Sequence, residues 1–193
     1  IRTAFNQGKR HPACATCWQQ ESVGSRSPRL GYTANMQNRY KLPAVAEQPV
    51  SIQWNFSNTC NFACRTCNLD FSTGWLNETK QLAQQGDDEA QGRLEQHSKH
   101  QLDQVRLQEI EPLLDHIQHL ELFGGETLLS PRLPSLLDMI VAHGRSHEID
   151  LVITTNGSVS PRDQLVKQFT QFRSVRLTFS VDAVTESEFK YIR

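Results

Sequence analysis

Three cysteines, Cys60, Cys64 and Cys67, lie close together with the spacing C-x3-C-x2-C. Thiolates at this spacing can converge on one metal centre from a single short loop. Structural zinc and a closed iron–sulfur cluster each normally take four protein ligands, whereas this loop supplies three. The spacing therefore predicts an iron–sulfur cluster with one iron left open to another ligand, and that open position is where chemistry could take place.

A zinc site is the alternative for the same three cysteines. It would need a fourth ligand from elsewhere in the chain, and a histidine is a suitable donor. The available candidates are His97, His100 and His116. In that case the chain would be a non-catalytic, metal-stabilised binding module, and the residues alone leave both interpretations open.

A second pair, Cys14 and Cys17, has C-x2-C spacing and is followed by Trp18. Two cysteines supply half of a metal site, and His11 could add a third ligand. A thioredoxin-like redox role would require a βαβ context that this segment lacks. The five cysteines are odd in number and clustered, which indicates metal binding in a reducing compartment rather than a disulfide framework. We therefore expect a cytoplasmic protein.

The elements that position these residues begin at residue 51, where strands and helices start to alternate. This alternation predicts an α/β fold with a parallel sheet. Predicted strands cover 51–57, 119–123, 150–154 and 175–181. Helices are expected at 74–85 and 98–115 with a break at 86–88, from Ser130-Pro131 to Gly144, from Ser160-Pro161 onward, and from about Thr185.

Unusual residues follow every predicted strand. The cysteine loop follows the first strand, and Gly124-Gly125-Glu126 follows the second. Thr155-Asn156-Gly157 follows the third, and Ser180-Val181-Asp182 ends the fourth. Each of the last three motifs could be a plain turn or helix cap. However, ligand sites of parallel sheets lie at the carboxyl ends of the strands, and all four motifs fall there.

Together, these four motifs resemble the radical S-adenosylmethionine (SAM) superfamily, in the right order and spacing over residues 51–193. The resemblance implies the first four βα units of a partial (β/α)6 TIM-like barrel. It also implies that Cys60, Cys64 and Cys67 bind three irons of a [4Fe-4S] cluster, whose fourth iron binds the amino and carboxylate groups of SAM. An electron from the cluster would cleave SAM to a 5'-deoxyadenosyl radical, which takes hydrogen from a substrate. The electron donor would be a protein such as flavodoxin or ferredoxin.

The resemblance also implies roles for the other strand-end residues. Gly124-Gly125-Glu126-Thr127 is similar to the Gly-Gly-Glu-Pro motif that receives the amino group of SAM, with Thr127 in place of proline. Thr155, Asn156 and Ser180 are expected to contact SAM. Asp182 is expected near the substrate, as a catalytic residue. Thr66 stands where many relatives carry an aromatic residue near the adenine.

We expect residues 1–50 to form an irregular extension, with one short helix near 17–23 that Gly24 ends. Its Cys14-x2-Cys17-Trp18 segment resembles that of twitch-type radical SAM proteins, which implies a second iron–sulfur cluster or zinc and a peptide or protein substrate. The extension carries seven basic and two acidic residues, so an RNA-modifying radical enzyme is an alternative.

Composition limits the remaining classes. The net charge of -1 gives no overall field that favours nucleic acid. No segment approaches the ~20 apolar residues of a membrane span, so we expect no membrane contact. The chain starts at Ile1 and stops within a predicted helix, which indicates a partial sequence with a core over 51–193 that is incomplete at its C-terminus.

Overall fold

The computed structural model describes residues 1–40, 48–99 and 107–193. The chain divides into two compact units, Ile1–Val50 and Ser51–Arg193. None of the helices in the described ranges combines the length and apolar character needed to cross a bilayer.

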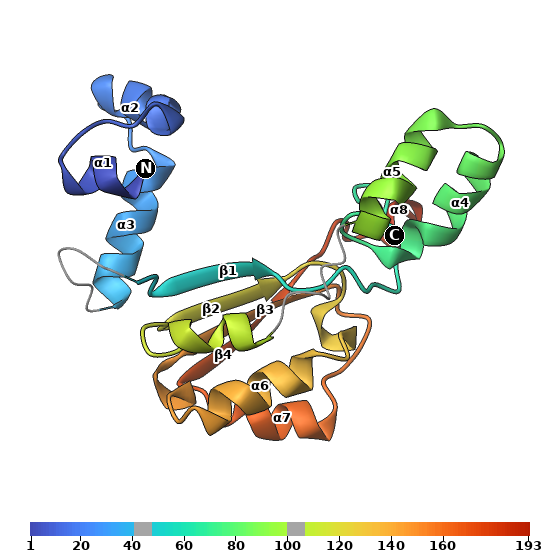
Figure 1. The fold of residues 1–193 in the computed structure, drawn as a ribbon. Helices are drawn as coiled ribbons and strands as arrows, with labels where there is room; N and C mark the ends of the chain where they lie inside the picture. The colour runs from blue at the N-terminus through green and yellow to red at the C-terminus, as the bar shows by residue number, and fades with distance from the viewer. Residues whose placement is uncertain (41–47, 100–106) are drawn as a thin grey trace. The chain divides into compact units, whose positions relative to one another are not determined.

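The second unit contains a four-stranded parallel sheet in the order β1-β2-β3-β4 (Figure 1). The strands are β1 (Ser51–Asn55), β2 (His119–Phe123), β3 (Asp150–Thr155) and β4 (Ser174–Phe179). Sequential parallel strands joined by helical segments are the arrangement of a partial TIM-like barrel, so the predicted fold class is confirmed.

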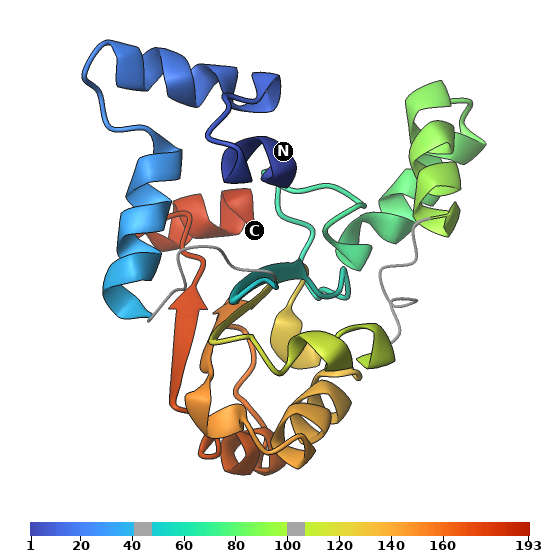
Figure 2. The same cartoon turned by 60° about the vertical axis from the view of Figure 1, so that its left-hand side comes forward.

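Two helices, α6 (Leu133–Ala142) and α7 (Asp163–Phe169), cover one face of this sheet in both views (Figures 1 and 2). Alternate strand residues point toward them because side chains of a strand alternate between faces. The fully buried ones include Leu120 and Leu122 of β2 and Leu151 and Ile153 of β3. They pack with leucines of α6 to form the core, which holds the carboxyl ends of the strands in place.

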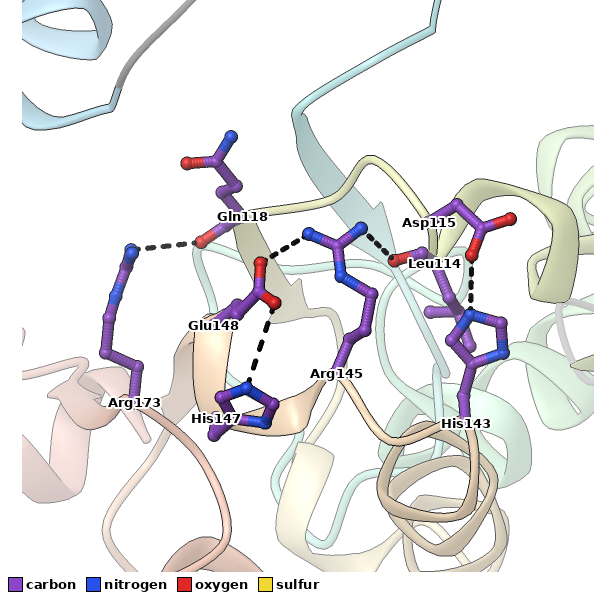
Figure 3. A network of polar contacts seen from close by, with 8 residues as sticks. All are labelled: Leu114, Asp115, Gln118, His143, Arg145, His147, Glu148 and Arg173. Carbon is purple, nitrogen blue, oxygen red and sulfur yellow. Dashed lines mark hydrogen bonds and ion pairs between the residues drawn. The ribbon is translucent and has the colours of Figure 1, made fainter.

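A polar network ties the amino ends of the strands together, at the opposite end from the cysteines (Figure 3). Arg145 precedes the turn η7 (Ser146–Glu148) and donates hydrogen bonds to Glu148 at 2.5 Å and to the Leu114 carbonyl at 3.4 Å. His143 pairs with Asp115 at 3.0 Å, and Arg173 donates to the Gln118 carbonyl at 3.4 Å. The Arg145 hydrogen bond lowers the pKa of Glu148. These contacts belong to the stabilising end of such a fold rather than to a site.

The segment between β1 and β2 departs from the expected helix pair. The turn η2 (Thr73–Trp75) and α4 (Leu76–Gln84) match the helix expected over 74–85, and the predicted break follows, where Gly86 has a φ of +91°. The next helix, α5 (Asp88–Lys99), was not predicted. The single helix expected over 98–115 falls partly on residues 100–106, which lie outside the described residues. From Leu107 onward the prediction is wrong. Two short turns, η4 (Leu107–Glu109) and η5 (Glu111–Leu113), stand there instead. Ile110, Leu114 and Ile117, whose spacing is typical of the buried face of a helix, are still buried here. Short turns, one of which contains a proline, place them in the core instead of a helix.

Two predicted helix starts are also wrong. The turn η6 (Thr127–Leu129) and the Ser130-Pro131 segment precede α6, whose first residue is Leu133. Ser130 contributes its carbonyl to Leu133 N–H at 3.2 Å rather than a side-chain cap. Ser160-Pro161 likewise precedes α7, which begins at Asp163. The last helix, α8 (Glu186–Ile192), does start after Thr185, whose side chain accepts a hydrogen bond from Glu188 N–H.

Residues 1–40 are mostly helical rather than irregular, which corrects the expectation for this part of the extension. They form α1 (Arg2–Asn6), the turn η1 (Pro12–Cys14), α2 (Ala15–Ser22) and α3 (Pro28–Arg39). Pro12 and Pro28 occupy first helical positions, where a missing N–H costs nothing. Ser27 caps α3 through Leu30 N–H at 3.2 Å. Gly24 follows α2 with a φ of +76°, as predicted.

Candidate metal and cofactor site

The three cysteine thiols of the loop after β1 line one pocket of about 130 Å3. All three residues are partly buried, and none forms a disulfide. The loop is folded back on itself, since Cys67 N–H donates to the Cys64 carbonyl at 2.9 Å. The other residues that line the pocket are Phe62, Phe71, Ser72, Gly125, Thr154, Thr155, Asn156, Ser180 and Arg193. The pocket therefore gathers residues from the carboxyl ends of three strands around three soft ligands.

The arrangement of the thiols bears on which metal centre they could hold. Within the described ranges, no three His, Cys, Asp or Glu side chains lie close enough to ligate one metal ion. Cysteines of an iron–sulfur cluster bind different irons, so their sulfurs lie further apart than the ligands of one zinc ion. Three free thiols around one pocket fit that donor set. His97, a candidate zinc ligand, lies with its Nδ1 3.4 Å from Asn58 Nδ2, His116 is exposed, and His100 falls outside the described residues.

Burial affects the protonation of two of these thiols. It raises the pKa of Cys64 and of Cys67 because a thiolate is poorly solvated there. For Cys64 the positive charge of Arg193 acts in the opposite direction, and for Cys67 a hydrogen bond with the Asn68 backbone does so. Both are therefore thiols in the metal-free chain at neutral pH, and metal binding must release their protons.

The turn η2 clamps the cysteine loop from outside. Cys60 N–H donates to Thr73 Oγ1 at 3.0 Å, and Trp75 Nε1 donates to the Cys64 carbonyl at 3.2 Å. A Cβ on Gly74 would lie 2.3 Å from the Phe62 carbonyl oxygen, so this contact requires glycine. The loop is thus held by backbone contacts that leave its thiols free to face the pocket.

The Gly124-Gly125 turn lies directly against the segment that leads into the cysteine loop. Both residues have positive φ, +93° and +56°. A Cβ on Gly124 would lie 1.8 Å from Asn55 Oδ1, and one on Gly125 would lie 2.3 Å from the Thr59 carbonyl oxygen. The Thr59 carbonyl also accepts a hydrogen bond from Glu126 N–H at 2.7 Å. Glycine is needed at both positions for contact with the chain itself as well as for backbone conformation.

Glu126 joins the ends of β2 and β3. Its carboxylate is fully buried and accepts hydrogen bonds from Thr155 Oγ1 at 2.8 and 2.9 Å, Asn156 N–H at 2.6 Å and Leu128 N–H at 3.1 Å. These neutral donors satisfy a buried charge that would otherwise be costly. Its carboxylate is therefore engaged by protein groups, and Glu126 does not line the pocket.

The predicted site residues thus fall into two groups. Gly125, Thr155, Asn156 and Ser180 line the pocket together with the three cysteines. Gly124, Glu126, Thr127 and Asp182 do not, and Thr127 is fully buried behind the turn.

Arg193 lines the pocket but was not expected from the sequence. It provides the one permanently charged side chain among the described residues around the pocket. Its Nε forms an ion pair with Asp182 at 2.8 Å, and its Nη2 donates to the Ser180 carbonyl. Asp182 and Arg193 are eleven residues apart in the sequence, and no local pattern relates one to the other.

Helix α8 is attached to the cysteine loop near Arg193. Arg65 N–H donates to the Ile192 carbonyl at 2.8 Å, and the Arg65 guanidinium lies 4.2 Å from the centre of the Tyr191 ring. A cation over an aromatic face is attractive. The contact holds the end of α8 against the loop that carries the thiols.

The second cysteine pair lies in the first unit. Cys14 ends η1, Cys17 lies in the first turn of α2, and both are partly buried. His11 Nδ1 accepts a hydrogen bond from Ala13 N–H at 3.1 Å, so this nitrogen caps the turn. Trp18 is covered by Arg29, whose guanidinium lies 4.2 Å from the ring centre. The described residues give the pair no third His, Cys, Asp or Glu ligand.

Comparison with known families decides the superfamily. A model described as "Radical SAM superfamily" matches residues 54–193. The chain belongs to the radical SAM superfamily. Enzymes of this superfamily generally use a [4Fe-4S] cluster, SAM and a reductant. No curated protein and no solved structure matches the chain, so the twitch-type subgroup stays a prediction.

A substitution at the glycine turn tests its contact with the chain. We expect Gly125→Ala to lower the free energy of unfolding more than Gly86→Ala does. Both glycines have positive φ, which costs an alanine about 1–2 kcal/mol. However, a Cβ at Gly86 meets nothing within 4 Å, whereas one at Gly125 meets the Thr59 backbone. Urea denaturation measures the difference, and equal losses would contradict the packing role.

A second substitution tests the Glu126 carboxylate. We expect Glu126→Gln to destabilise the metal-free chain by about 1–3 kcal/mol, because the amide NH2 cannot accept hydrogen bonds from Thr155 or Asn156. Glu186→Gln on the exposed face of α8 is the matched control, with little expected change. A stability unaffected by Glu126→Gln would show that the carboxylate does not hold the two strand ends together.

Proposed function

We propose that the chain reductively cleaves SAM at a [4Fe-4S] cluster held by Cys60, Cys64 and Cys67. The observation that supports this most strongly is the single pocket that these thiols share with the carboxyl ends of the strands. When bound, the cluster supplies the electron for SAM cleavage, the reaction that starts hydrogen abstraction from a substrate.

The other pocket residues bind and orient SAM in this proposal. Ser180 and Thr155 offer hydroxyl groups, and Gly125 offers backbone polar groups to the SAM amino group. Gly124, Glu126 and Thr127 act behind Gly125 by fixing the turn. Asn156 lines the same pocket.

Arg193 would attract the SAM carboxylate, since a guanidinium can bind a carboxylate through two parallel hydrogen bonds. Asp182 then serves Arg193 as a partner, through their ion pair. Its predicted catalytic role near the substrate stays a proposal.

We further propose that the substrate is a peptide or protein and that the protein works in the cytoplasm with a flavodoxin or ferredoxin as reductant. The support for the substrate is the similarity of Cys14-x2-Cys17-Trp18 to twitch-type proteins. The basic composition of residues 1–50 favours the alternative of an RNA substrate. RNA binding that weakens steeply with salt would support that alternative.

Substitution of one loop cysteine tests the function. After anaerobic reconstitution, we expect Cys64→Ala to abolish production of 5'-deoxyadenosine from SAM and dithionite, because two thiolates cannot hold the cluster. Cys14→Ala is the matched control and should retain the activity. Wild-type rates in Cys64→Ala would contradict the proposed function. A colourless, zinc-loaded wild-type protein would favour the binding module instead.

Cys14 and Cys17 are proposed to bind a separate zinc ion or iron–sulfur cluster, with the remaining ligands from outside the described residues. We expect the Cys14→Ala/Cys17→Ala double variant to contain less metal per chain than wild type while it still cleaves SAM. Elemental analysis measures the metal content. An unchanged content would show that the pair is not a ligand set.

A further inference from the structure

The Cys60 sulfur accepts two hydrogen bonds from N–H groups. Phe62 N–H donates to it at 3.4 Å, and Asn156 Nδ2 donates to it at 3.8 Å. The first donor belongs to the backbone of the cysteine loop. The second donor is the side chain of Asn156, which follows β3 in a different part of the fold. Substitution of this one residue therefore removes the second hydrogen bond.

The orientation of the Asn156 amide is fixed by its neighbours. Ser158 N–H donates to Asn156 Oδ1 at 2.9 Å, which assigns the oxygen. The NH2 group then faces the cysteine loop, where it also donates to Asn61 Oδ1 at 3.1 Å. Asn61 in turn donates to Ser158 Oγ at 2.9 Å. A network that determines both ends of an amide leaves no equivalent flipped arrangement.

The backbone of Asn156 is fixed as well. Its N–H donates to the buried Glu126 carboxylate at 2.6 Å, directly after β3. Residue 156 is thus held from the sheet side by Glu126, and its Oδ1 is held by Ser158 N–H. Its amide is preorganised toward Cys60 before any cofactor is present.

We infer that Asn156 raises the reduction potential of the cluster by donating a hydrogen bond to the Cys60 sulfur. The inference rests on the proposed cluster at Cys60, Cys64 and Cys67. Reduction adds one electron from the external reductant to the cluster, and this negative charge spreads partly onto the thiolate sulfurs. An N–H directed at a sulfur stabilises the reduced form more than the oxidised form, and such hydrogen bonds are a recognised influence on cluster potentials. Asn156 is then a positioning residue that makes the cluster easier to reduce.

Two substitutions at residue 156 test this inference. Asn156→Ala removes the donor, and Asn156→Asp replaces it with an acceptor that carries negative charge while it can still accept from Ser158 N–H. We expect Asn156→Ala to lower the equilibrium constant for one-electron reduction by roughly tenfold, which corresponds to about 59 mV. Asn156→Asp should lower it further. An EPR-monitored redox titration of the reconstituted, SAM-free protein measures both values.

Asn61→Ala is the matched control. It removes the contact between Asn61 and Asn156 but leaves Asn156 Oδ1 bonded to Ser158 and Nδ2 free to donate to Cys60. We expect its potential to match wild type. An equal fall in Asn61→Ala and Asn156→Ala would assign the effect to loop position and overturn the inference.

Other outcomes separate this inference from the proposed function. A wild-type protein that assembles no cluster contradicts the proposed function. A cluster that forms in every variant with an unchanged potential contradicts the role of Asn156 alone. If Asn156→Ala binds no cluster, Asn156→Asp, which keeps the size of the side chain, decides the question.

Discussion

The site depends on one backbone contact, the packing of the Gly124-Gly125 turn against residues 55–59. β1 and β2 are neighbouring strands, so their carboxyl ends are close in any case. Only residues without a Cβ allow the turn after β2 to touch the segment that enters the cysteine loop. This contact sets the distance between the thiols and the rest of the pocket. The motif that resembles a SAM-binding element is therefore first an element of the fold.

A buried carboxylate extends this contact across the sheet. Glu126 joins the turn after β2 to Thr155 and Asn156 after β3. The ion pair of Arg193 with Asp182 and the contact of Arg65 with Ile192 continue the connection to the end of β4 and back to the cysteine loop. These contacts, which require no bound ligand, hold the residues that line the pocket in place. Preorganisation of this kind is what radical chemistry needs, since water and misplaced groups must be kept out.

The sequence predicted the sheet and the order of its motifs because each signal is local. Apolar strands with turn residues after them and three cysteines on one loop can be recognised within a few residues. Helix boundaries were less predictable, since Ser130-Pro131 and Ser160-Pro161 satisfy the rule for helix starts yet lie just before the helices. In the first fifty residues Pro12 and Pro28 start helical turns, and composition does not distinguish a proline that starts a helix from one that prevents it.

Roles that depend on contacts between distant segments could not be predicted, because the signals in the sequence are local. Nothing near Glu126 indicates that its carboxylate accepts hydrogen bonds from residues 155 and 156, and nothing near Arg193 indicates a place on the pocket wall. Asn156 was expected at the pocket, but its hydrogen bond to the Cys60 sulfur follows from the fold alone. These contacts join segments that are far apart in the sequence, and no sequence pattern indicates that the segments meet.

Cys60, Cys64 and Cys67 are proposed to leave one iron of a cluster open to SAM. Electron–nuclear double resonance of the reduced, reconstituted protein with SAM labelled by 17O in its carboxylate measures this most directly. A hyperfine coupling between the label and the cluster is expected if, as proposed, the carboxylate binds the open iron directly. A reduced cluster that shows no coupling and no change in its EPR spectrum at saturating SAM would contradict it.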